Sequence, residues 1–93
     1  MLYIESLEID DRILDKIESK HSVTFNEVEE ACLSGKRNVR KGKEGLYKVF
    51  SQTEAGRHLL VVLVERGGGV WRVVTAREMT DQERRLYRRV RGA

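Results

Sequence analysis

The residues best suited to chemistry lie in segment 65–89, which reads ERGGGVWRVVTAREMTDQERRLYRR. Arg72 lies between Trp71 and Val73 in an apolar run, and an arginine-dense stretch follows it. A charge in an apolar strand is costly unless it is exposed or paired. Because a guanidinium binds two phosphate oxygens at once, the segment favours a ligand that contains phosphate. The alternative is that these arginines belong to an ordinary solvated helix surface.

Charge is divided unevenly along the chain. Residues 1–35 carry a net charge of −6 and residues 36–93 a net charge of +9, and 12 of the 18 basic residues are arginine. A basic, arginine-rich region is typical of proteins that bind nucleic acid. We therefore expect nucleic acid to contact the C-terminal two thirds of the chain, and the acidic first third to lie outside that contact.

Length and composition narrow the class of protein further. The 93 residues allow a single domain, residues 1–93, whose catalytic groove would be shallow and on one face of a sheet. The single cysteine, Cys32, suits a reducing compartment and is expected in the core. His21 and His58 are isolated, so neither a metal nor a cofactor is implied. Because the sequence has no membrane-spanning run and an acidic N-terminus, we expect a cytoplasmic protein.

Two helices are expected in the N-terminal third. Residues 10–20 place apolar side chains, including Ile17, at helical spacing. Thr24 and Glu27 then form a capping box, which predicts a second helix that ends near Gly35.

A third helix is expected at the C-terminus. Thr80 and Glu83 form a second capping box, and the helix should end near Val90. Leu86, Tyr87 and Val90 are spaced to face inward, which leaves the arginines of this helix to solvent or a ligand.

The remaining pattern predicts strands. Three consecutive glycines, Gly67–Gly69, supply a tight reversal between two of them. The expected segments are an edge strand at 3–9, a short strand or loop at 36–41, and strands at 46–53, 59–64 (the central one) and 70–77. The fold class is therefore α+β, a small antiparallel sheet with all helices on one side and an open opposite face.

Two segments resemble a known family. Residues 20–31, KHSVTFNEVEEA, are similar to the KHGVSFEEA segment of BrnT-type toxins. Residues 50–87 resemble the second half of the same family, with its ER pair, its R-[IV]-[IV]-[ST]-AR strand and its arginine-rich T-x-x-E helix. The resemblance covers residues 9–90 in the same order. The chain departs from the family pattern at Ser22, where glycine is usual, and at residues 8–10, which lack the usual F-x-W-D.

The resemblance implies a RelE-like fold and a metal-independent endoribonuclease toxin that inhibits translation. It also implies a cognate BrnA-like ribbon-helix-helix antitoxin, and a homodimer or a toxin–antitoxin hetero-oligomer. Metal-free cleavage requires activation of a ribose 2′-hydroxyl, stabilisation of charge on the phosphate and protonation of the leaving 5′-oxygen.

Arg72 and Arg77 are predicted to stabilise that charge. In a regular strand they would point to opposite faces, so Arg77 must lie at or beyond the strand end to join Arg72. The alternative for Arg72 is a salt bridge to Glu65. Glu65 is either a general base or a residue that holds an arginine in place. His21 either transfers a proton or closes the apolar face of the first helix after Ile17.

The other basic residues are predicted to bind the RNA backbone rather than to react. They are Arg66, Lys36, Arg37, Arg40, Lys41, Arg84, Arg85 and Arg88. The alternative function is a non-catalytic RNA-binding protein or a degenerate toxin-like interaction module, which would keep the basic surface without the chemistry.

Overall fold

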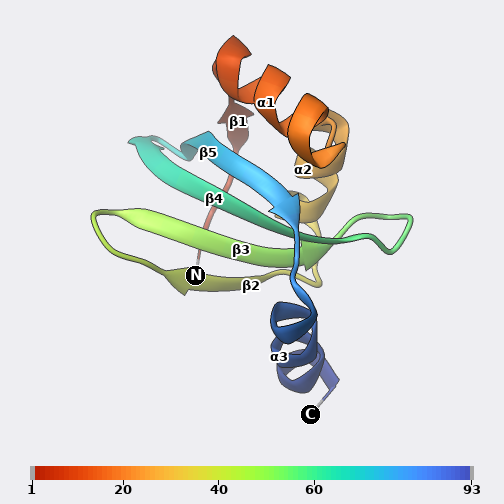
Figure 1. Cartoon of the computed structure of the whole chain (residues 1–93). Helices are drawn as coiled ribbons and strands as arrows, with labels where there is room; N and C mark the ends of the chain where they lie inside the picture. The colour runs from red at the N-terminus through yellow and green to blue at the C-terminus, as the bar shows by residue number, and fades with distance from the viewer. Residues whose placement is uncertain (1, 93) are drawn as a thin grey trace.

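A computed structural model describes residues 2–92 and contains a sheet of five strands with three helices (Figure 1). The elements are β1 (Ser6–Glu8), α1 (Asp11–His21), α2 (Phe25–Leu33), β2 (Asn38–Lys41), β3 (Leu46–Gln52), β4 (His58–Gly67), β5 (Val70–Glu78) and α3 (Asp81–Gly92). None of the three helices has both the length and the apolar character needed to span a bilayer, within the part of the chain described.

The strand order is β1-β5-β4-β3-β2, with the predicted central strand β4 in the middle. Strands β2 to β5 form an antiparallel meander, but β1 runs parallel to β5, with Glu8 opposite Arg72. The prediction of a purely antiparallel sheet is therefore wrong, and the sheet is mixed. The alternation of residues 3–9 indicated a strand, but it carried no information about the partner of that strand or its direction.

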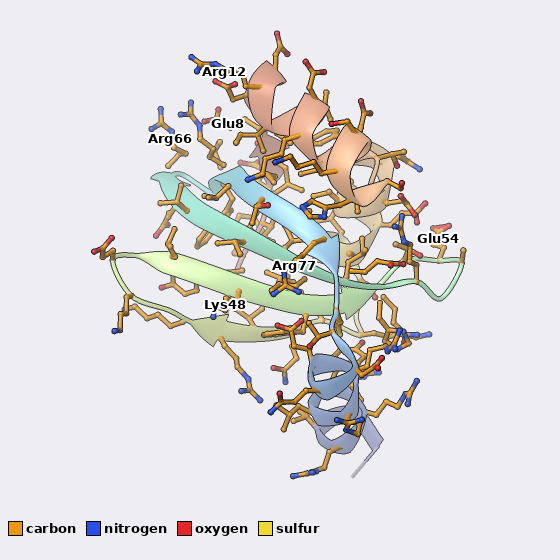
Figure 2. The ribbon with its side chains drawn as sticks, in the orientation of Figure 1. Glu8, Arg12, Lys48, Glu54, Arg66 and Arg77 are labelled. Atoms are coloured by element: carbon orange, nitrogen blue, oxygen red, sulfur yellow. The ribbon has the colours of Figure 1, made fainter. Side chains whose placement is uncertain are left out.

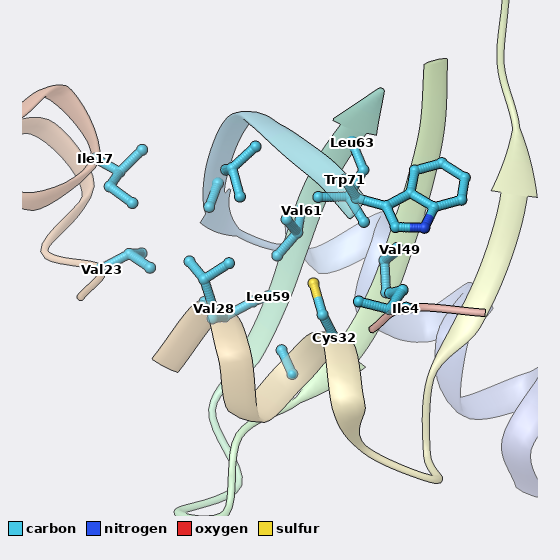
Figure 3. Packing of buried hydrophobic residues seen from close by; sticks show 13 residues of the cluster. Ile4, Ile17, Val23, Val28, Cys32, Val49, Leu59, Val61, Leu63 and Trp71 are labelled. Atoms are coloured by element: carbon cyan, nitrogen blue, oxygen red, sulfur yellow. The ribbon is translucent and has the colours of Figure 1, made fainter. Parts of the chain in front are cut away.

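Helices α1 and α2 cover one face of the sheet and form the core with it. Ile17, Val28 and Cys32 from the helices are completely buried, as are Val49 and Val61 from the strands (Figure 3). Burial raises the pKa of the Cys32 thiol to about 12, as expected for an inert core cysteine.

Helix α3 lies against the opposite face, near one end of the sheet (Figure 1). Its Tyr87 ring packs edge-on against His58 with 5.7 Å between ring centroids, and its hydroxyl donates to the Lys36 carbonyl at 2.6 Å. Because His58 alternates with the core residue Leu59, it points away from α1 and α2. The prediction that all helices share one side is therefore wrong. Leu86 and Val90, which were expected to face inward, remain 37% and 47% exposed.

The predicted capping boxes are confirmed at both sites. Thr24 accepts from the Glu27 backbone at 3.1 Å, and Glu27 accepts from the Thr24 backbone at 3.0 Å. Thr80 and Glu83 make the same exchange at 3.2 and 2.8 Å. These side chains satisfy backbone N–H groups that a helix start leaves unpaired, and so fix where α2 and α3 begin.

The Gly67–Gly69 turn joins β4 to β5 and also holds the N-terminal segment. Gly69 has a φ of +83°, and a Cβ on it would lie 2.9 Å from the Tyr3 ring, so a larger residue would be both strained and in collision. Its carbonyl accepts from the Glu5 and Ser6 backbone at 2.8 and 3.3 Å. This contact seats β1 on β5 and so brings Glu8 beside Arg72.

Candidate functional site

A β-bulge in β5 decides where the two predicted catalytic arginines point. Val62 pairs with Thr75 while Leu63 pairs with Val73, so Val74 is an extra residue on β5. In a regular strand, residues five positions apart point to opposite faces. The extra residue leaves four alternating steps between Arg72 and Arg77, so both side chains lie on the same face. This is the face opposite to α1 and α2.

The two arginines are nevertheless well separated on that face. Four regular strand steps lie between them, which corresponds to about 13 Å between their Cα atoms. Arg77 lies within β5 and not beyond its end. Arg72 and Arg77 accordingly line two different hollows.

Arg77 and His21 line one shallow hollow at the edge of the sheet, where α1 ends beside the last residues of β5. The hollow is lined by Lys20, His21, Ser22, Arg57, Arg77, Glu78 and Thr80. His21 is half-buried and Lys20 is exposed. The hollow thus joins two predicted catalytic residues that lie far apart in the sequence.

The guanidinium of Arg77 is held in a fixed orientation. Its Nη1 and Nη2 atoms contact the two Glu83 carboxylate oxygens at 2.8 and 3.1 Å, and Nη1 also donates to the Glu78 carbonyl at 3.0 Å. The hydrogen bond that Arg77 donates to Glu83 raises the pKa of Arg77, and the same bond lowers the pKa of Glu83. The remaining N–H donors of Arg77 are available for an anion.

Arg57 lines the same hollow and was not among the predicted site residues. It contacts Glu27 at 2.9 Å and Glu78 at 3.0 Å, and it donates to the carbonyls of Ser22 at 2.6 Å and His21 at 3.0 Å. Burial alone would lower the pKa of Arg57, but the hydrogen bonds that Arg57 donates to Glu78 and Glu27 raise it above its ordinary value. Arg57 therefore ties the end of α1 to the start of α2. The sequence places Arg57 in a family-like stretch but does not show these long-range partners.

Arg72 lies at the other end of the open face, in a cluster with Glu8 and Arg66. The Glu8 Oε1 atom is 3.1 Å from Arg66 Nε and 3.4 Å from Arg72 Nε. Figure 2 shows Glu8 and Arg66 together, away from Arg77. The alternative salt bridge of Arg72 to Glu65 is not formed. Glu65 is exposed and pairs with Trp71, so it points to the side opposite Arg72.

The residues predicted to bind RNA around β2 do not form one surface. Arg37 donates to the Cys32 carbonyl at 2.7 Å and to the Leu2 carbonyl, and so anchors the N-terminal segment. Arg40 lies over the Phe50 ring and Lys41 over the Tyr47 ring, at 5.8 and 6.0 Å.

Only Arg40 of this group shares the face of Arg72 and Arg77. It pairs with Lys48, an exposed base on the same face that was not predicted (Figure 2). Lys36 is exposed at the start of the segment. On α3, Arg84 is ion-paired with Asp81, whereas Arg85 and Arg88 are exposed.

This fold, a mixed sheet with two helices on one face and a third on the other, is similar to that of a solved BrnT-type toxin. One protein with a similar structure is BrnT of Brucella abortus, described as a ribonuclease toxin. Its crystal structure matches with a TM-score of 0.69 and 14% sequence identity, over 82% of this chain and 97% of that one. At this identity the likeness establishes the fold. The sequence matches no protein-family model and no curated protein.

Proposed function

We propose that this chain is a metal-independent endoribonuclease toxin of RelE-like architecture, with its active site in the hollow between α1 and β5. The observation that supports this most strongly is the convergence of His21 and Arg77 there, beside Lys20 and Arg57. Transfer of an RNA phosphate requires a group that transfers a proton and groups that stabilise negative charge. An imidazole beside fixed positive charges can supply both.

In the proposed reaction the neutral His21 imidazole accepts the proton of a ribose 2′-hydroxyl. The 2′-oxygen then bonds to the adjacent phosphorus, and the bond from phosphorus to the 5′-oxygen breaks. The 5′-oxygen leaves with a proton from solvent, which reaches it through the open hollow. The products are a 2′,3′-cyclic phosphate and a 5′-hydroxyl.

The basic residues of the hollow have separate tasks in this proposal. Arg77 and Lys20 stabilise the extra negative charge on the phosphorus oxygens. Arg57 donates from all three of its nitrogens to Glu27, Glu78 and the carbonyls of Ser22 and His21, whereas the Nε donor of Arg77 has no such partner among residues 2–92. Arg57 therefore positions the His21 backbone rather than the phosphate. Arg72 is about 13 Å away along β5 and would bind a different phosphate. Glu65 points away from both arginines, and its catalytic role stays a prediction.

The proposal extends to the biological partner. Cleavage of cytoplasmic RNA would inhibit translation, so a host must neutralise the protein with an antitoxin. We propose a BrnA-like ribbon-helix-helix antitoxin and a toxin–antitoxin hetero-oligomer, with a homodimer as the alternative state of the free chain. The likeness in fold to the Brucella protein, which is described as a ribonuclease toxin, supports this assignment.

The test is cleavage of a labelled RNA by purified protein. The Arg77→Gln variant should lose about 10² to 10³ in cleavage rate, the effect typical of a removed charge-stabilising donor. The matched control is Arg89→Gln, an exposed α3 arginine, which should leave the rate unchanged. A DNA version of the substrate should stay intact, and cleavage should persist in EDTA.

Three results would contradict the proposal. Cleavage of the DNA version would exclude attack by a 2′-hydroxyl, and loss of activity in EDTA would exclude the metal-free reaction. RNA binding without any cleavage would favour the non-catalytic module instead.

A further inference from the structure

Helix α1 has a basic stripe that the acidic composition of its region conceals. Residues 1–35 contain three basic residues, Arg12, Lys16 and Lys20, and each is four positions from the next. At 3.6 residues per turn, this spacing places all three on one side of the helix. All three side chains are exposed.

The acidic residues of α1 lie on a different side. Asp11, Asp15 and Glu18 are also at helical spacing, but their stripe is turned away from the basic one by roughly a quarter of the circumference or more. Helix α1 is therefore not uniformly acidic. Its basic and acidic residues lie on different sides of the helix.

The basic stripe faces β5 along two hollows. Lys20 lines the hollow that contains Arg77. Arg12 and Lys16 line a second hollow, farther along the same pair of elements, whose β5 wall includes Arg72 and Val74. The distance from Arg12 to Lys20 along α1 is about 12 Å. This nearly equals the separation of about 13 Å between Arg72 and Arg77 on β5.

The β5 wall also has an open backbone edge. Strand β1 pairs with Val70, Trp71 and Arg72, and no strand among residues 2–92 pairs with that edge beyond Arg72. Backbone N–H groups on such an edge can donate to an extended ligand.

We propose that this α1–β5 groove, defined by Arg12, Lys16, Lys20, Arg72 and Arg77, binds the backbone of single-stranded RNA on one side of the scissile phosphate. The inference rests on the proposed function and names the substrate form that its active site takes. A flexible single strand can lie between the basic residues of α1 and the arginines of β5, whereas a rigid duplex presents its phosphates on an outer surface. Asp10 and Glu78 are the acidic residues that also line the two hollows. The groove then determines the direction in which the RNA enters the hollow at His21.

The test compares two variants that remove the same charge. Arg12→Gln/Lys16→Gln removes two bases of the groove, and Lys43→Gln/Arg89→Gln removes two exposed bases outside it. Binding of a nuclease-resistant 2′-O-methyl single strand is measured over a range of salt concentrations. Circular dichroism establishes that each variant is folded. If the double variant is unstable, Lys16→Gln alone replaces it.

The groove variant should bind more weakly, by roughly tenfold at low salt, because two phosphate contacts are lost. The slope of log K against log salt should fall by about 1.4 for the double variant, and by about 0.7 for Lys16→Gln. The control variant should keep the wild-type slope, and duplex RNA should bind more weakly than the single strand.

Three results would overturn the proposed groove. They are an unchanged salt slope in the groove variant, an equal loss of RNA affinity in the control variant, and equal binding of duplex and single-stranded RNA. A wild-type protein that cleaves RNA while the groove variant binds normally would leave the proposed function intact. A wild-type protein that neither binds nor cleaves RNA would contradict the proposed function itself.

Discussion

At the scale of single residues, His21 can be tested because a catalytic role and a structural role predict different measurements. His21 lines the hollow with Arg77, and its carbonyl is held by Arg57 at 3.0 Å. We expect His21→Gln to keep the melting temperature within a few degrees and to reduce cleavage per folded molecule by about 10² to 10⁴. Stability and cleavage are measured on the same sample.

His58→Gln is the matched control for this experiment. His58 packs against Tyr87 under α3, and burial, together with the nearby Arg88 and Arg84, lowers its pKa. This variant should lose stability and keep its cleavage per folded molecule. If His21→Gln instead destabilises the fold by roughly 1 to 3 kcal/mol and the folded fraction stays active, His21 is a packing residue.

At the scale of elements, the Arg77–Glu83 pair links the end of β5 to the first turn of α3 and makes this junction sensitive to acid. The hydrogen bond from Arg77 lowers the pKa of Glu83 below its ordinary value of 4.5. A lowered pKa contributes stability above that ordinary value, and this stability is lost as pH falls through the folded-state pKa.

We therefore expect Glu83→Gln to cost about 1 kcal/mol at neutral pH and to make less difference below about pH 4.5, where the wild type loses the same contribution. The check is the free energy of unfolding against pH, with the exposed Glu54→Gln as the control. A constant difference between wild type and Glu83→Gln from neutral to acid pH would contradict the assignment.

Most elements could be predicted from the sequence because their signals are local. The two capping boxes gave the starts of α2 and α3, and the Gly67–Gly69 turn gave the β4–β5 hairpin. What could not be predicted depends on long-range partners. The pairing of β1 with β5 is one example, and the side of the sheet occupied by α3 is another.

The candidate site was predictable only in part for the same reason. His21 and Arg77 were recognised from family-like motifs, but their proximity depends on how α1 crosses the edge of β5. The roles of Arg57 and Glu8 depend on side-chain contacts that no local spacing encodes. The bulge at Val74 also lacked a local signal, because the valine-rich run looks like a regular strand.

At the scale of the whole molecule, the open face combines exposed positive charge with an uncovered apolar strip on α3. Leu86 and Val90 are exposed beside Phe50 and Arg40 in a small groove. We expect a co-expressed antitoxin to form a stable complex that protects the amides of β5 and α3 from hydrogen exchange, because it would cover both features. Exchange is compared between the free and the bound chain.

The control for the complex is the outer side of α1, which carries Asp11, Asp15 and Glu18 and should exchange equally in both states. Protection confined to that acidic side would place the partner elsewhere on the molecule.

Because Val74 is an extra residue in β5, the shared face of Arg72 and Arg77 depends on the number of residues between them. Loss of one residue there would leave the charge of the chain unchanged and both arginines in place, but it would turn Arg77 to the side where Ala76 now packs. A comparison based only on the presence of the two arginines would not detect this change. The length of this stretch therefore matters to the arrangement as much as its side chains do, and a one-residue gap here in a related sequence would mark a protein that has lost the arrangement.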